Sequence, residues 1–240
     1  MKNKRWLKKG LIFKASGQHG WMNSHAQVPT PILMEDKIRI FFSTRTKQTE
    51  SKTTFIDVLA KDPKQILYLH DRQIIKNDSP GAFDEHGIMP SAIRKDNKNN
   101  YLLYYSGWSQ RNSVPYSNLT GIAESKDGIN FKRCFEGPIL SINKLEPYSA
   151  TSPCFISRGR FLYLFYCSGC DWKKINDKYE HTYDIKLAKS IDGINWEQDG
   201  ISVIKQKNED EALTRPTVFE LNNKYHMYFC YRGSLDFRDG

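Results

Sequence analysis

The chain has 240 residues and a formal net charge of 36 − 27 = +9, because lysines and arginines outnumber aspartates and glutamates. No apolar run is long enough to cross a bilayer, so we expect a soluble protein without a membrane partner. The basic residues are scattered over predicted turns without a nucleic-acid-binding motif, which argues against a nucleic-acid partner. A basic start without an apolar signal segment and an odd number of cysteines, five, predict a cytoplasmic location without a disulfide framework.

The first predicted element lies near the N-terminus. Trp6 precedes Gly10 at the same spacing at which Trp196 precedes Gly200, and an apolar segment follows each glycine. Ring-shaped β folds often close by pairing an N-terminal strand with the unit built from the C-terminus, which leaves no sheet edge open. We therefore expect residues 1–20 to form an outer strand that closes the last unit.

Four apolar, aromatic-rich segments then follow at regular spacing. Each comes after one of four prolines, which are 61, 63 and 63 residues apart. Runs of β-branched and aromatic residues bounded by Asn, Asp, Gly or Lys turns predict strands joined in hairpins. The four prolines are Pro29, Pro90, Pro153 and Pro216, and the predicted strands are 38–42, 101–105, 161–166 and 225–229.

A second landmark repeats after 65 residues, as Ser125-Lys-Asp-Gly-Ile-Asn-Phe131 and Ser190-Ile-Asp-Gly-Ile-Asn-Trp196. Its Asp-Gly pair predicts a tight hairpin, and we expect Phe131 and Trp196 to pack in the core. Further strands are predicted before the hairpin, at 121–124 and 185–189, and after it, at 138–140 and 201–204. Four short antiparallel strands in each repeat predict an all-β fold, a five-bladed β-propeller.

Blade boundaries follow from the repeat. Five blades of about 63 residues need roughly 315 residues, so we expect a single propeller domain that is C-terminally incomplete, with about four blades present. A four-bladed ring, or closure by a partner chain, is the alternative. The predicted blades are 21–82, 83–145, 146–208 and the start of a fourth at 209–240.

The candidate site lies where the loops before the four prolines converge at one end of the channel, which we call the mouth. Three of these four loops contain carboxylates. Carboxylates around a shared cavity can separate their pKa values and serve as general acid and base in glycoside cleavage. The candidate catalytic residues are Asp84, Glu146, Glu211 and His25.

In these loops and hairpins the chain resembles the five-bladed propeller superfamily of arabinanases, β-xylosidases, invertases, levansucrases and mannoside phosphorylases. The resemblance is to an uncharacterised branch of that superfamily. The resemblance implies that Asp84 is the carboxylate of the second blade and Glu146 the general acid of the third. Trp21-Met-Asn-Ser24 resembles the invertase sequence Trp-Met-Asn-Asp-Pro, but Ser24 replaces the nucleophilic Asp. His25 is therefore the candidate base, with Asp84 and Glu85 as the alternative.

The predicted function is that of a glycoside-active enzyme, a glycosidase that uses carboxylate acid/base catalysis. Whether the protein is an enzyme stays open at this point. One alternative is a glycoside phosphorylase, in which His25, Arg45 and Arg215 hold phosphate. Others are a non-catalytic carbohydrate-binding propeller in glycan biosynthesis and a structural domain. The expected partner is a carbohydrate, neutral or anionic or phosphorylated, with no cofactor and no metal. The candidate substrate-binding residues are Gln27, Arg45, Glu85, His86, Trp108, Tyr148, Ser149, Trp172, Arg215 and Arg232.

Overall fold

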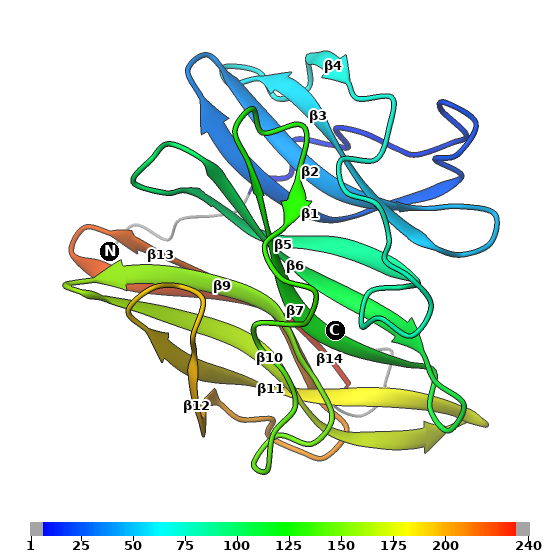
Figure 1. Cartoon of the computed structure of the whole chain (residues 1–240), viewed down its shortest axis with the longest axis vertical. Helices are drawn as coiled ribbons and strands as arrows, with labels where there is room; N and C mark the ends of the chain where they lie inside the picture. Colours follow the sequence, from blue (N-terminus) through cyan, green and yellow to red (C-terminus); the bar gives the residue numbers. More distant parts are fainter. Residues whose placement is uncertain (1–6, 234–240) are drawn as a thin grey trace.

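A computed structural model describes residues 7–233, which form fourteen β-strands and no helix (Figure 1). Within these residues, accordingly, no helix is long and apolar enough to cross a membrane. The predicted all-β class is confirmed. Blade 1 consists of β1 (Ser24–Met34), β2 (Lys37–Arg45), β3 (Ser51–Leu59) and β4 (Ile66–Leu69); blade 2 of β5 (Gly87–Lys95), β6 (Tyr101–Gln110), β7 (Tyr116–Ser125) and β8 (Lys132–Arg133); blade 3 of β9 (Ala150–Arg158), β10 (Phe161–Ile175), β11 (Lys178–Ser190) and β12 (Glu197–Ile204). A hairpin of β13 (Ala212–Leu221) and β14 (Lys224–Arg232) follows.

Each blade is an antiparallel sheet whose strands pair in chain order, so the first strand of each blade is its inner strand. Neighbouring strands of successive blades meet through single parallel pairs, Ser51 with Gly87 and Tyr183 with Ala212. Figure 1 shows the three blades one after another down the view, with the inner strands facing the middle of the molecule. The described part of the chain thus holds three four-stranded blades and one hairpin, and the total of five blades stays a prediction.

The four landmark prolines lie in the inner strands, beside irregularities in the pairing. Each inner strand shifts its register against the second strand at the proline. Proline lacks a backbone donor, and β-bulges and sheet edges are the places where a strand tolerates this. The residue before the proline has a positive φ in three of the four strands: 51° at Val28, 52° at Ser152 and 57° at Arg215. The repeat therefore encodes a bulge near the axis of the molecule.

The core lies between the blades. Blades 1 and 2 enclose one apolar cluster that includes Phe41, Phe55, Leu103 and Phe131, all buried. Between blades 2 and 3, the rings of Tyr104 and Phe155 pack with centroids 5.0 Å apart. The prediction that Phe131 packs in the core is confirmed.

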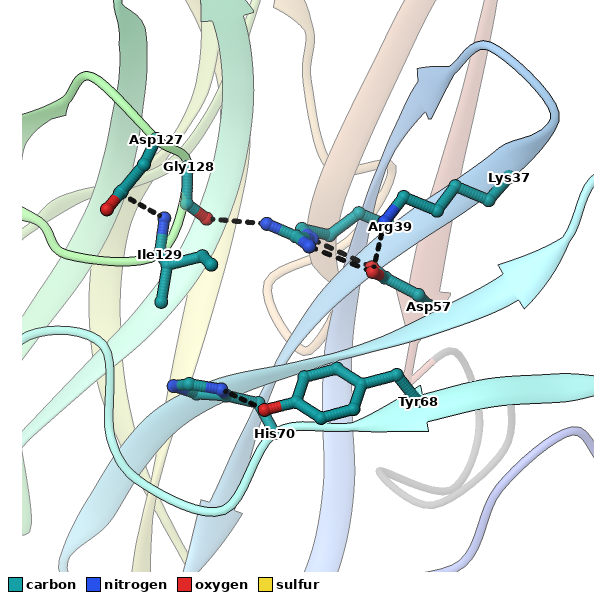
Figure 2. Close-up of polar contacts among 8 residues, drawn as sticks. All are labelled: Lys37, Arg39, Asp57, Tyr68, His70, Asp127, Gly128 and Ile129. Atoms are coloured by element: carbon teal, nitrogen blue, oxygen red, sulfur yellow. Dashed lines mark hydrogen bonds and ion pairs between the residues drawn. The ribbon is translucent and has the colours of Figure 1, made fainter.

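The Ser-x-Asp-Gly hairpins also join the blades, because each is held by the second strand of the preceding blade. Arg39 in β2 donates to the Gly128 carbonyl at 3.1 Å while its guanidinium pairs with buried Asp57 at 2.7 and 2.8 Å (Figure 2). In the next blade, the Tyr104 hydroxyl donates to the Gly193 carbonyl at 3.0 Å. Gly128 and Gly193 are equivalent positions of the repeat, so the same turn receives a contact in both blades.

Residues 7–15 pair with no strand of the described chain, and Phe13 packs on Phe42 of blade 1 with centroids 5.2 Å apart. Residues 1–6 lie outside the described residues, and closure of the last blade by residues 1–20 stays a prediction. One strand prediction is wrong. In blade 2 the fourth strand is Lys132–Arg133, while Leu140 of the predicted strand makes only an isolated bridge to Thr120.

Candidate functional site

Asp84, the predicted second-blade carboxylate, is completely buried. Its Oδ2 accepts hydrogen bonds from Arg133 at 2.9 and 2.8 Å and from the Tyr105 hydroxyl at 3.1 Å. Burial raises the pKa of Asp84, although Arg133 and Tyr105 act in the opposite direction. Oδ2 thus has partners inside the protein, whereas the buried Oδ1 has none.

Glu146, the predicted general acid, occupies the matching place in blade 3 and is also completely buried. The Tyr166 hydroxyl lies 2.7 and 2.9 Å from its two oxygens, and Lys186 Nζ lies 3.9 Å from Oε2. Asp84 and Glu146 have no partner in common among these contacts. Each acid lies within hydrogen-bond distance of the hydroxyl of a second-strand tyrosine and beside a cation, Arg133 of the fourth strand or Lys186 of the third. Their catalytic assignment stays a prediction.

The other two candidate catalytic residues lie apart from these networks. Glu211 is 5% exposed and accepts a hydrogen bond from the backbone of Lys207, which closes its own loop. His25 is exposed, with its Nδ1 2.8 Å from Ser24 Oγ. The described structure therefore does not gather the four predicted catalytic groups into one contact network.

The mouth between blades 1 and 2 contains a cavity of about 590 Å³. Arg45, at the end of β2, lies over the Trp108 ring, 5.4 Å from its centroid. Burial lowers the pKa of Arg45, but a guanidinium stays charged at neutral pH. The lining combines two arginines with aromatic and amide side chains and contains no carboxylate. It consists of Arg45, Thr49, Met89, Trp108, Gln110, Arg111, Pro115, Tyr116 and Asn118.

An aromatic cluster extends the mouth from blade 2 to blade 3. Tyr116 meets Trp172 edge-on, with centroids 4.9 Å apart, and its hydroxyl lies 3.1 Å from that of Tyr183. Trp172 stacks on His181 at 4.1 Å, and burial lowers the pKa of His181 to about 3. The predicted residue Tyr148, which is 39% exposed, packs edge-on against His181 at 6.3 Å.

Buried polar atoms without a hydrogen-bond partner gather at this end of the blades. His181 is 1% exposed, yet neither ring nitrogen has a partner, and neither does Ser149 Oγ. A side chain at Gly169 would collide with His181 Nε2 and Ser149 Oγ, so both atoms border the space above that glycine. Unpaired buried polar groups are costly, and polar ligands or waters usually satisfy them. The further examples at the mouth are Gln27 Nε2, Trp108 Nε1 and Asn118 Oδ1.

The remaining predicted binding residues have partners inside the protein. Glu85 accepts from the Gly81 backbone at 2.7 Å, and His86 packs against Trp108 with centroids 5.7 Å apart. Arg232 donates to the His181 carbonyl at 2.9 Å. Arg215 donates to the carbonyls of Pro29 and Pro90 and to Thr30, and it therefore joins inner strands.

Sequence reasoning missed Arg111, Tyr116 and His181, which lie at the outer ends of the β6–β7 and β10–β11 hairpins. The sequence did contain a signal for these residues. The loop between the second and third strands lies at the same end of the blade as the loop before the inner strand, so its residues belong to the mouth. In residues 7–233, no group of His, Cys, Asp and Glu side chains is arranged to hold a metal ion.

Comparison with known proteins places the chain in a family. An uncharacterised protein of Mycobacterium tuberculosis, found in two strains, is 33% identical over 231 residues, which cover 95% of this chain and 76% of that protein. The chain belongs to the family of this mycobacterial protein. No protein-family model matches the sequence.

More distant comparisons bear on the resemblance that the sequence predicted. A 1,2-β-oligomannan phosphorylase of Thermoanaerobacter sp. is 25% identical over 161 residues, covering 66% of this chain and 51% of that protein. A glycosyl hydrolase of Bacteroides ovatus has the same fold, with a TM-score of 0.71 at 11% identity over 95% of this chain and 70% of its own. The resemblance to the five-bladed propeller superfamily of glycosidases and phosphorylases is confirmed.

Proposed function

We propose that this chain binds a carbohydrate at the mouth, in the cavity beside Trp108. The supporting observation is a lining of aromatic rings, amides and arginines surrounded by buried polar atoms that lack partners. Sugars present apolar ring faces and many hydroxyls, so Trp108 and Tyr116 supply packing surfaces while the amides of Gln110 and Asn118 in the lining supply donors and acceptors. Arg45 and Arg111 favour a sugar that bears a carboxylate or phosphate.

Binding alone explains the mouth better than hydrolysis. Glycoside hydrolysis needs two carboxyl groups that flank the scissile bond. Neither Asp84 nor Glu146 exposes any surface, and both are hydrogen-bonded within the protein. One experiment can test carbohydrate binding and the predicted carboxylate mechanism together.

The experiment measures binding to a glycan array and by calorimetry, together with release of reducing sugar. We expect Trp108→Ala and Arg45→Ala to weaken binding about tenfold, since each removes a contact of roughly 1.4 kcal/mol. Arg72→Ala is the matched control, because its side chain is 76% exposed. Sugar release that disappears in Glu146→Gln and Asp84→Asn, while binding persists, would instead establish carboxylate catalysis.

A second candidate is glycoside phosphorolysis, which the two mouth arginines and the phosphorylase relative favour. In this reaction an oxygen of hydrogen phosphate attacks the anomeric carbon, the glycosidic C–O bond breaks, and the leaving oxygen takes the proton that the phosphate gives up. Phosphate supplies the nucleophile, so a first-blade carboxylate is not required. Formation of a sugar 1-phosphate only with inorganic phosphate, and its loss in Arg45→Ala, would support this candidate; no product in either condition would exclude it.

A further inference from the structure

A second cavity, of about 800 Å³, lies between blades 2 and 3 at the opposite ends of the strands from the mouth. Strand β6 connects the two regions, because Leu102 lines this groove and Trp108 lines the mouth. Six residues of extended strand span about 20 Å, so the groove is separate from the carbohydrate site. Its volume is within the range of pockets that hold small molecules.

Two arginines on opposite blades line the groove without a carboxylate partner. Arg94 of blade 2 packs against the blade 3 hairpin at Gly193 and donates to the Tyr104 hydroxyl at 3.4 Å. Its Nε is buried and has no hydrogen-bond partner. Arg160, in the turn after β9, places its guanidinium over the Phe161 ring, and in residues 7–233 neither arginine forms an ion pair. Both guanidinium groups therefore retain donors.

Two acids of the groove accept hydrogen bonds from backbone amides. Asp96 accepts hydrogen bonds from the backbone of Lys98 and Asn100, and Asp192 from that of Ile194 and Asn195. Glu124 lies at the end that the groove shares with a neighbouring hollow. The lining has two further cations, Lys98 and Arg133, and Arg133 is paired with Asp84.

We propose that this groove binds a small anionic ligand of the size of a sugar phosphate. Arg94 and Arg160 contact the phosphate, since guanidinium groups donate two parallel hydrogen bonds to such oxygens. Leu162 and Ile194 provide the apolar surface against which the rest of the ligand packs. The site is independent of the carbohydrate function proposed for the mouth.

The experiment titrates glucose 1-phosphate into an Arg45→Ala/Trp108→Ala/Arg111→Ala protein, which lacks the mouth arginines and the Trp108 packing surface. We expect saturable binding that weakens at least tenfold when Arg94→Ala and Arg160→Ala are added. Lys61→Ala/Lys64→Ala is the matched control, because it removes two exposed cations of blade 1. Affinity should also fall with added salt, while methyl glucoside, which lacks the anion, should not bind.

A second variant distinguishes binding in the groove from general electrostatic attraction of the anion. Ser157→Trp leaves every arginine in place but fills the groove from the exposed end of β9, and it should reduce binding as strongly. Unchanged thermal unfolding midpoints would show that each variant is folded. Absence of glucose 1-phosphate binding in the mouth-silenced protein, or binding that neither groove variant weakens, would overturn the proposal.

Discussion

His181 is a titratable side chain that the fold keeps neutral. It lies between Trp172 and Tyr183, with ring centroids 4.1 and 4.3 Å away, and only 1% of its surface is exposed. Burial lowers its pKa to about 3, and the charge of Arg232 acts in the same direction. A protonated imidazole therefore cannot be accommodated without cost at moderately acidic pH.

This burial predicts a pH dependence of stability. An unfolded histidine titrates near pH 6.5, so below that pH the unfolded state binds a proton that the folded state does not. The stability is fully present above about pH 6.5 and is lost as the pH falls towards 3, by at most about 1.4 kcal/mol per pH unit. Urea unfolding of the wild type and of His181→Phe between pH 4 and 7.5 measures it.

The substitution should flatten the difference between neutral and acidic pH, since phenylalanine keeps the stacking but cannot titrate. His25→Gln is the control, because it replaces an exposed histidine and keeps His181. Parallel profiles for the wild type and His181→Phe would contradict this assignment.

At the level of elements, the Ser-x-Asp-Gly hairpins depend on their aspartates. Asp192 accepts hydrogen bonds from the backbone of Ile194 and Asn195, each at 2.8 Å, and these hold its pKa well below its usual range. At Asp127 a desolvation that raises the pKa is outweighed by hydrogen bonds from Asn130 and Ile129, and the pKa is again well below its usual range. Both turns thus favour an ionised carboxylate.

We expect these turns to weaken on acidification. A depressed folded pKa contributes stability above the unfolded value of about 4, and this stability is lost as the pH falls below it. An Asp127→Asn/Asp192→Asn protein should therefore lose less stability than the wild type between pH 5 and 2. The measurement is the difference between the two denaturation curves, with Asp177→Asn, whose side chain is 96% exposed, as the control. Identical slopes would rule out the turns as the source.

The contact between blades 1 and 2 predicts a non-additive pair of substitutions. Arg39→Met should destabilise the protein by about 3 kcal/mol, because Asp57, which is 3% exposed, keeps only Lys37 as a partner. Arg39→Met/Asp57→Leu removes both charges and should lie within about 1 kcal/mol of the wild type. Urea unfolding of the two single variants and the double variant tests this. Additive losses would show that the hairpin contact at Gly128, rather than the buried charge, is decisive.

The strand pattern could be predicted from the sequence where that pattern repeats. The aromatic second strands and the Asp-Gly hairpins lie where they were predicted, because period and turn chemistry are local properties. The fourth strand of blade 2 was misplaced, since Lys132–Arg133 is too short to carry a pattern. The bulges beside the prolines were also missed: proline marked the repeat, but a positive φ at Val28 or Ser152 depends on how strands pair.

The site was harder to predict than the fold because the exposure of a side chain depends on tertiary packing. The sequence places Asp84 and Glu146 in the mouth loops, but their exposure depends on whether a tyrosine one strand away covers them. Tyr105 and Tyr166 do so in both blades. The candidate binding residues Trp108 and Arg45 line one cavity, because both lie near the end of a second strand, and their part in binding stays a prediction.

For the molecule as a whole, Arg215 links inner strands that are far apart in the sequence. Its guanidinium donates to the Pro29 carbonyl at 2.7 Å, to Thr30 Oγ1 at 3.0 Å and to the Pro90 carbonyl at 3.2 Å. One side chain of β13 thereby fixes blades 1 and 2 against the last hairpin. The arrangement around a common axis thus depends on a polar contact as well as on the apolar packing between blades.

We expect Arg215→Met to loosen this centre without unfolding the blades. Loss of three hydrogen bonds from a charged donor should cost about 3 kcal/mol in the free energy of unfolding. Hydrogen exchange should then accelerate in β1 and β5 as well as in β13, because the contact spans all three strands. Arg72→Ala, at the surface, should leave exchange unchanged. Faster exchange confined to β13 would show that Arg215 stabilises only its own hairpin and that the blades are positioned by apolar contacts alone.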